Sequence, residues 1–203
     1  MITIQEAFKR LKEGNARFVR GETDLRLTPE QRKSLAGNQA PFAVFFGCSD
    51  SRVPAEIVFD CGLGDLFVIR VAGNVVAPSL VGSVEFAVAK FGTPLVVVTG
   101  HSACGAVTAT YDELTQPTQN QSPNLRSIVE RVRPSVETLL EAKLPREQVI
   151  RHAVRANVRL SVDHLRHGSR LLEDAIDEGR LLVVGAEYSL DTGVVDFFDG
   201  APK

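Results

Sequence analysis

Several features typical of nucleic-acid-binding, membrane or secreted proteins are missing from this sequence. The formal net charge is only −2, and lysine and arginine are scattered along the chain, so we expect no surface for nucleic acid and no membrane-binding face. The longest apolar run falls short of the about 20 residues that span a bilayer. The N-terminal segment, MITIQE, lacks the basic and apolar parts of a secretory signal.

Cysteine is also scarce, since the chain contains only Cys48, Cys61 and Cys104. An odd, small number of cysteines does not make a disulfide framework, which favours a reducing compartment, and we expect a cytoplasmic protein. Cys61 lies in the sequence FDCG with no histidine at metal-binding spacing, and we interpret it as a structural thiol. The other two cysteines lie in polar motifs, CSDSR at residues 48–52 and HSAC at residues 101–104.

The apolar pattern predicts an α/β fold. Continuous apolar runs of strand length occupy residues 42–46, 66–69, 95–98 and 181–184. Strands that are apolar on both faces are typical of a parallel sheet covered by helices, and helical patterns separate these runs. Residues 194–197 predict a short antiparallel edge strand, so we expect a mostly parallel sheet core with flanking helices.

Helical patterns fill most of the remaining chain. They are expected at residues 3–20, 28–37, 79–91, 102–114, 125–142 and 145–177, with Gly168 as a candidate break in the last. A chain of 203 residues is long enough to bury one full core. We therefore expect a single domain over residues 1–203, with a helical N-terminal arm at residues 1–38 and an α/β core at residues 39–203.

The two polar motifs each follow a predicted strand. Because open parallel sheets place ligands at the carboxyl ends of their strands, we expect both motifs on the same rim. Cys48 and Asp50 can face one centre, since residues i and i+2 of an extended segment point the same way. His101 and Cys104 can share a face if they lie on a first helical turn. Two cysteines and one histidine leave one position of a tetrahedral zinc ion open, which is the catalytic pattern.

Each motif has a simpler explanation when it is taken alone. A cysteine at the end of a buried strand is usually a small core residue. The spacing of His101 and Cys104 arises often by chance, and Asp50 with Arg52 is typical of a surface ion pair. The occurrence of both motifs at two predicted strand ends favours the zinc centre.

The motifs resemble those of the bacterial and plant β-class carbonic anhydrases. They occur in order as CSDSR at residues 48–52, GDLFVIRVAGN at 64–74, EFAV at 85–88 and GHSACG at 100–105. The resemblance begins at residues 11–15 and continues to residues 185–188, so it covers nearly the whole chain.

The resemblance implies a zinc ion held by Cys48, His101 and Cys104 and the reversible hydration of carbon dioxide to bicarbonate and a proton. Water at the fourth zinc position attacks carbon dioxide in this family. Asp50 is implied as the residue that hydrogen-bonds this water, and Arg52 as the residue that holds Asp50 by a charge-assisted pair. In some members the aspartate displaces the water, so Asp50 is implied as a zinc ligand in that closed state only.

The resemblance also implies a small, partly apolar substrate pocket. Its expected residues match family positions and are Gln39, Phe67, Ala72, Gly73, Phe86 and Gly105. Phe86 departs from the plant-type pattern, which has a tyrosine there, contributed across a dimer interface.

Members of the family form homodimers, often paired as dimers of dimers, and their first helix typically lies across the neighbouring subunit. The apolar stripe of Ile4, Ala7 and Leu11 fits such a contact. The same stripe fits equally well a helix that packs on its own sheet.

Two other functions stay open. Hydrolases of carbonyl sulfide or carbon disulfide use the same zinc ligands, although Gln39 and the Asp50–Arg52 pair favour carbon dioxide. An inactive structural or redox zinc protein would need Asp50 as a permanent fourth ligand. Arg52 disfavours that arrangement, and structural zinc sites usually use more closely spaced cysteines.

Overall fold

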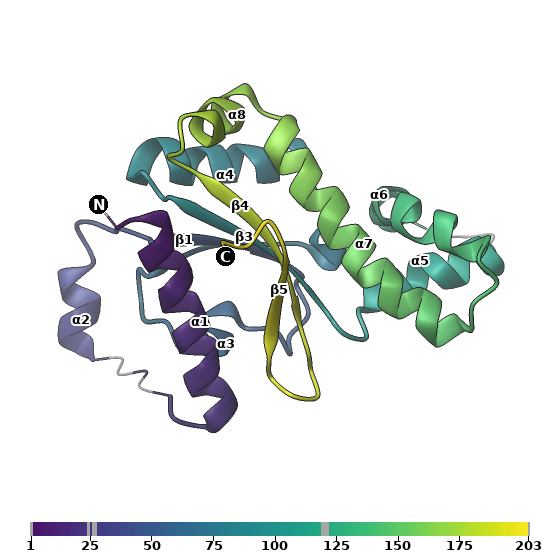
Figure 1. Ribbon diagram of the computed structural model, residues 1–203, viewed down its shortest axis with the longest axis horizontal. Coiled ribbons are helices and arrows are strands. Elements are labelled where there is room, and N and C mark those ends of the chain that lie inside the picture. Colours follow the sequence, from purple (N-terminus) through teal and green to yellow (C-terminus); the bar gives the residue numbers. More distant parts are fainter. Residues whose placement is uncertain (1, 24, 26–27, 119–121, 203) are drawn as a thin grey trace.

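The computed structural model describes residues 2–23, 25, 28–118 and 122–202. Its centre is a five-stranded sheet with the strand order β2-β1-β3-β4-β5 (Figure 1). The strands are β1 (Ala43–Gly47), β2 (Leu66–Arg70), β3 (Leu95–His101), β4 (Leu182–Tyr188) and β5 (Val195–Asp199). The first four are parallel, and β5 pairs antiparallel with β4 at the edge. The predicted α/β fold with a mostly parallel sheet is confirmed.

Helices cover both faces of this sheet, which explains the continuous apolar runs. Helices α1 (Ile4–Arg20) and α3 (Ala55–Val58) lie on one face, and α4 (Pro78–Phe91), α7 (Arg146–His167) and α8 (Arg170–Asp177) lie on the other (Figure 1). The remaining helical elements are α2 (Pro29–Ser34), the 3₁₀ turn η1 (Ala72–Asn74), α5 (Gly105–Thr115) and α6 (Pro123–Leu140). Among the described residues, no helix is both long and apolar enough to cross a membrane.

The predicted helix at residues 145–177 divides into α7 and α8, as the glycine between them indicates. A Cβ atom at Gly168 would lie 2.4 Å from the carbonyl oxygen of His164, so only glycine fits there without a shift. Glycine also lets α7 approach the sheet closely. A Cβ atom at Gly100 of β3 would lie 2.6 Å from Cγ2 of Val158, and one at Gly185 of β4 would lie 2.9 Å from Cγ1 of the same valine.

The N-terminal helix α1 packs on the sheet of its own chain. Thr3 and Glu6 form a capping box, in which each side chain accepts a hydrogen bond from the other residue's backbone N–H. Ala7, Phe8 and Leu11 are buried in the core between α1 and the sheet. The apolar stripe is thus used within the chain, and a contact of α1 with a neighbouring subunit stays a prediction.

Strands β3 and β4 continue at least three residues beyond the ends of their predicted apolar runs. Strand β3 continues through Thr99 and Gly100 to His101, because its backbone stays paired with β4 as far as the His101–Tyr188 position. Polar and small residues at the end of a buried strand lack the apolar pattern that predicts a strand. Their backbone groups nevertheless complete the hydrogen-bond ladder between β3 and β4. This extension carries His101 to the rim of the sheet.

Candidate metal centre

Three possible metal ligands meet at the carboxyl ends of two neighbouring strands. Cys48 directly follows β1, His101 is the last residue of β3, and Cys104 directly precedes α5. Strands β1 and β3 are parallel neighbours, so their ends share one edge of the sheet. The ligand atoms of the three side chains all lie within 4.8 Å of one another, and all three residues are buried. The structure therefore brings together the cysteines and the histidine that the two motifs supply.

The turn between His101 and Cys104 differs from the predicted geometry. Helix α5 begins only at Gly105, so the prediction that both residues share a first helical turn is wrong. Instead, Ala103 adopts a left-handed conformation with φ 53°, and the N–H of Ser102 donates to the carbonyl of Tyr188 at 3.0 Å. The strand ladder thus ends in a tight turn that folds Cys104 back towards the imidazole.

The imidazole of His101 is prepared to act as a ligand. Its Nδ1 lies 2.9 Å from the carbonyl oxygen of Ser102, which can only accept, so Nδ1 carries the proton and Nε2 presents a lone pair. Nε2 is buried and has no hydrogen-bond partner among the described residues. A buried polar atom without a partner is costly, and this one faces two thiols.

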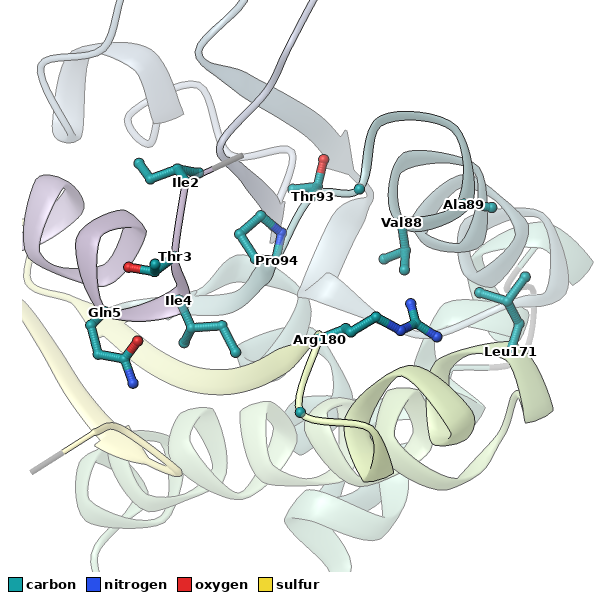
Figure 2. Close-up of a pocket in the computed structure, with 12 residues that line it drawn as sticks. Ile2, Thr3, Ile4, Gln5, Val88, Ala89, Thr93, Pro94, Leu171 and Arg180 are labelled. Carbon is teal, nitrogen blue, oxygen red and sulfur yellow. The ribbon is translucent and has the colours of Figure 1, made fainter.

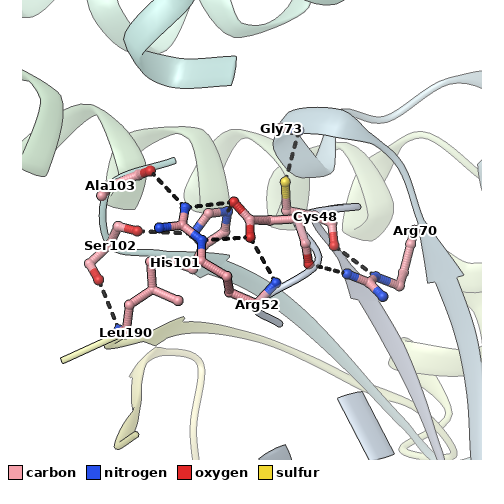
Figure 3. Close-up of polar contacts among 9 residues, drawn as sticks. Cys48, Arg52, Arg70, Gly73, His101, Ser102, Ala103 and Leu190 are labelled. Carbon is pink, nitrogen blue, oxygen red and sulfur yellow. Dashed lines mark hydrogen bonds and ion pairs between the residues drawn. The ribbon is translucent and has the colours of Figure 1, made fainter. Parts of the chain in front are cut away.

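Within the cluster, Cys48 has thiolate character that Cys61 lacks. The S–H of Cys104 donates to Cys48 and is the main cause that lowers the pKa of Cys48, while the same shared proton raises the pKa of Cys104. The backbone N–H of Gly73 also donates to Cys48 Sγ, at 3.3 Å (Figure 3). Burial raises the pKa of Cys61 to about 12, in keeping with a structural thiol.

This donor set fits zinc. Two thiolates and one imidazole nitrogen are soft and borderline ligands of the kind Zn²⁺ prefers, and three ligands leave one position of the tetrahedron free. The unpartnered Nε2 of His101 is the atom that such an ion would satisfy.

Asp50 lies beside the cluster in an ion pair with Arg52. The Arg52 Nε and Nη2 donate to Asp50 Oδ1 at 2.9 Å and Oδ2 at 2.8 Å, and the backbone N–H of Arg52 donates to Oδ1 at 2.9 Å. These bonds hold the pKa of the Asp50 carboxyl well below its usual range. Oδ2 is 3.8 Å from Nε2 of His101, so the carboxylate faces the cluster while the guanidinium holds it.

Arg70, the last residue of β2, supports the segment that carries Cys48 and Asp50. Its Nε donates to the carbonyl of Cys48 at 2.8 Å, and its Nη2 donates to the carbonyl of Asp50 at 2.5 Å (Figure 3). Sequence reasoning did not predict this contact. The available signal was an arginine at the end of an otherwise apolar strand, where a charge needs a partner.

The expected pocket residues fall into two groups. Ala72 and Gly73 of η1 and Gly105 at the start of α5 lie next to the cluster. Gln39 precedes β1, and the length of that strand, roughly 16 Å at about 3.3 Å per residue, separates it from Cys48.

Phe67 and Phe86 are also remote from the cluster of their own chain. Phe67 stands opposite Val44, near the start of β1, and its ring centroid is 6.2 Å from that of Phe86 on α4. Within one chain, the structure therefore does not bring Gln39, Phe67 and Phe86 to the metal ligands.

Two cavities differ in their relation to the cluster. A cavity of about 740 Å³ lies at the amino ends of β3 and β4, away from the cluster. Ile4, Pro94 and Arg180 are among its lining residues (Figure 2). It contains none of the candidate site residues. A second cavity of about 850 Å³ adjoins the cluster, because Arg52 and Ala103 form part of its wall.

The fold is a mostly parallel α/β sheet, and its rim carries a buried Cys-His-Cys cluster beside an aspartate–arginine pair. These features define a class of protein that has the ligand set of catalytic zinc. Comparison with known proteins identifies the family within this class. The carbonic anhydrase family profile matches residues 43–195. A carbonic anhydrase of Mycolicibacterium smegmatis is 43% identical over 194 residues, which cover 94% of this chain and 91% of that protein.

Solved structures agree with this match. The β-carbonic anhydrase CafA of Aspergillus fumigatus superposes with a TM-score of 0.76 at 27% identity, covering 98% of this chain and 92% of that one. A tetrameric β-carbonic anhydrase of Sordaria macrospora gives a TM-score of 0.72 at 26% identity, covering 84% and 87%. The chain belongs to the β-class carbonic anhydrase family and is an enzyme of that class, which confirms the resemblance in its motifs.

Proposed function

We propose that this enzyme catalyses the reversible hydration of carbon dioxide to bicarbonate and a proton, with Zn²⁺ held by Cys48, His101 and Cys104. The observation that carries the proposal is the buried, unpartnered Nε2 of His101, which faces two thiols next to the Asp50 carboxylate. When bound, zinc supplies Lewis acidity, which lowers the pKa of water from about 15.7 to about 7.

Asp50 orients the attacking water. The Arg52 guanidinium keeps Asp50 ionised at neutral pH, and an ionised carboxylate only accepts hydrogen bonds. A water that donates to Asp50 turns a lone pair towards carbon dioxide. Arg52 also restrains the carboxylate, so rotation of Asp50 into the cluster as a fourth ligand requires the ion pair to break. The closed state of Asp50 is thus part of the same proposal.

Small residues form the wall of the pocket on the side of the cluster. Ala72, Gly73 and Gly105 offer little bulk and no charge, which suits a small linear substrate without a charge. Asn74, in the same turn as Ala72 and Gly73, is buried and bonded through its carbonyl to Ser161, so this wall is fixed in place.

A second copy of the chain supplies the remaining pocket residues. Phe86 is 52% exposed and belongs to an aromatic group with Phe67 and Phe91, whose ring lies 5.6 Å from that of Phe86. A partly exposed aromatic group of this kind is typical of a protein interface. A homodimer or a dimer of dimers would bring this surface and Gln39 to the neighbouring cluster.

The proposal extends to the domain and the compartment. Residues 1–203 act as one domain, in which the arm at residues 1–38 leads into the zinc-binding core at residues 39–203. The three cysteines are free thiols, as expected for a reducing cytoplasm.

Stopped-flow measurement of carbon dioxide hydration, with the zinc content determined on the same sample, tests the function. We expect activity at about one zinc per chain that rises from acidic to alkaline pH. The Cys61→Ala variant serves as a control that keeps both zinc and activity. Full zinc content without hydration at any pH would refute the proposal, and assays with carbonyl sulfide and carbon disulfide would then test the alternative substrates.

A further inference from the structure

Helix α7 presents two polar side chains in a face that is otherwise apolar. Asn157 is 1% exposed and Ser161 is 2% exposed, while Val154, Val158 and Val162 around them are buried in the core. Asn157 and Ser161 are four residues apart, so they lie on the same face of the helix. Buried amide and hydroxyl groups destabilise a core unless they are hydrogen-bonded, which makes their partners informative.

Both side chains bond to the backbone of the turn η1. Asn157 Nδ2 donates to the carbonyl of Gly73 at 2.7 Å, and Ser161 Oγ donates to the carbonyl of Asn74 at 2.8 Å. The close approach of α7 to the sheet, which Gly100 and Gly185 permit, brings these donors within reach.

The turn holds an uncommon backbone conformation that needs such support. Gly73 has φ +69° and Asn74 has φ 43°, both in the left-handed region. A Cβ atom at Gly73 would lie 2.9 Å from Cβ of Ala106, so the turn is also tightly packed against α5. Because the carbonyls of both Gly73 and Asn74 are hydrogen-bonded to α7, the orientation of the turn relative to α7 is fixed.

The opposite side of the same turn faces a metal ligand. The N–H of Gly73 donates to Sγ of Cys48 at 3.3 Å, while the carbonyl of Gly73 accepts from Asn157 (Figure 3). This N–H and this carbonyl belong to the two peptide groups on either side of the Gly73 Cα atom. A hydrogen bond that holds the Gly73 carbonyl therefore also restricts the direction of the Gly73 N–H. Asn157 thereby controls the hydrogen bond to Cys48 without touching the sulfur.

We propose that Asn157 is a positioning residue of the metal centre, which aims the Gly73 N–H at Cys48 and limits electron donation by that thiolate. The inference rests on the proposed zinc site. Two thiolates together cancel the formal charge of Zn²⁺, and an N–H bond to one sulfur leaves the ion more acidic. Groups that orient metal ligands typically change metal affinity or activity about 10- to 100-fold when they are removed.

Cobalt substitution gives a readout that does not depend on activity. Co²⁺ in place of zinc shows a thiolate-to-metal charge-transfer band, whose energy reports the hydrogen bonding of the sulfur. The Asn157→Leu variant removes the amide donor and keeps the number and branching of the side-chain heavy atoms. Ser161→Ala is the matched control, because it also loses a buried hydrogen bond from α7 to the turn, but at the carbonyl of Asn74.

We expect Asn157→Leu to move the band to longer wavelength, because the Cys48 thiolate donates more strongly when the Gly73 N–H is no longer aimed at it. Ser161→Ala should keep the band of the wild-type protein. An unmoved band in metal-loaded Asn157→Leu, or an equal shift in both variants, would overturn the inference. Absence of any charge-transfer band in the wild-type protein would instead refute the thiolate metal site itself.

Amide hydrogen exchange in the wild-type protein tests the inference without a variant. With metal bound, the amide of Gly73 should exchange slowly, because its hydrogen is held on the sulfur of Cys48. Exchange at Gly73 as fast as at an exposed loop amide would contradict the proposed bond, even if Asn157→Leu fails to fold.

Discussion

Replacement of Gly73 by alanine should destabilise the protein through two independent effects. The φ of +69° at this position costs an L-residue about 1–2 kcal/mol. The new methyl group would lie 2.9 Å from Cβ of Ala106 and 3.3 Å from Cγ2 of Val132. Both contacts involve short, stiff side chains on helices, so relief requires backbone movement, and such overpacking costs about 1–3 kcal/mol. The free energy of unfolding should fall by about 2–5 kcal/mol.

Thermal unfolding followed by circular dichroism measures this effect, with Gly82→Ala as the control. For a chain of this length each 1 kcal/mol corresponds to about 2–4 °C, so Gly73→Ala should melt roughly 4–20 °C below the wild type. Gly82 lies within α4, and no heavy atom comes within 4 Å of its added Cβ, so alanine there should stabilise the helix by up to about 1 kcal/mol. A wild-type melting temperature for Gly73→Ala would refute the assigned conformation and packing of the turn.

Other predictions concern the metal ligands, the ion pair and the exposed aromatic surface. Cys104→Ala should abolish zinc retention in metal analysis after gel filtration, whereas Cys61→Ala should retain zinc; equal zinc content in both variants would contradict the ligand assignment. Asp50→Asn should keep zinc but lose most hydration activity in stopped-flow assays, and a fully active variant would remove Asp50 from the mechanism. Arg52 lowers the pKa of Asp50, so this carboxylate stabilises the fold above about pH 4 and loses that contribution as the pH falls further. Urea titrations at about pH 5 and about pH 3 should therefore show a larger loss of stability in the wild type than in Asp50→Asn, and equal losses would count against the ion pair. Phe86→Tyr should be tolerated, and dissociation of the proposed homodimer in light scattering would show instead that the aromatic surface is tightly packed.

The fold could be predicted largely from the burial of strands on both faces. The four apolar runs and the short edge strand all became strands, because helices cover both faces of the sheet. The elements α3 and η1 could not be predicted, since they contain four and three residues and have no room for a periodic pattern. The extension of β3 to His101 depends on backbone pairing with β4. The polar and small side chains of this segment give no sign of that pairing in the sequence.

The position of the candidate site followed from topology, but its supporting contacts did not. Strands β1 and β3 are parallel neighbours, so Cys48 and His101 lie on one rim of the sheet. This placement could be predicted from the positions of the two residues at the ends of their strands. The turn before Cys104 was mispredicted, because alanine gives no signal for the left-handed conformation of Ala103. The hydrogen bond from Asn157 to the Gly73 carbonyl was missed because the two residues are 84 positions apart in sequence. The sequence of a helix with one buried asparagine does not indicate which group accepts its hydrogen bond.

X-ray absorption at the zinc edge of the wild-type protein tests the central claim most directly, since it reports the atoms that surround the ion. The proposed centre predicts two sulfur neighbours at about 2.3 Å, one imidazole nitrogen at about 2.0–2.1 Å and one further light atom. A zinc shell without sulfur, or with only one sulfur, would contradict the assignment of Cys48 and Cys104 as ligands and the catalytic account built on them.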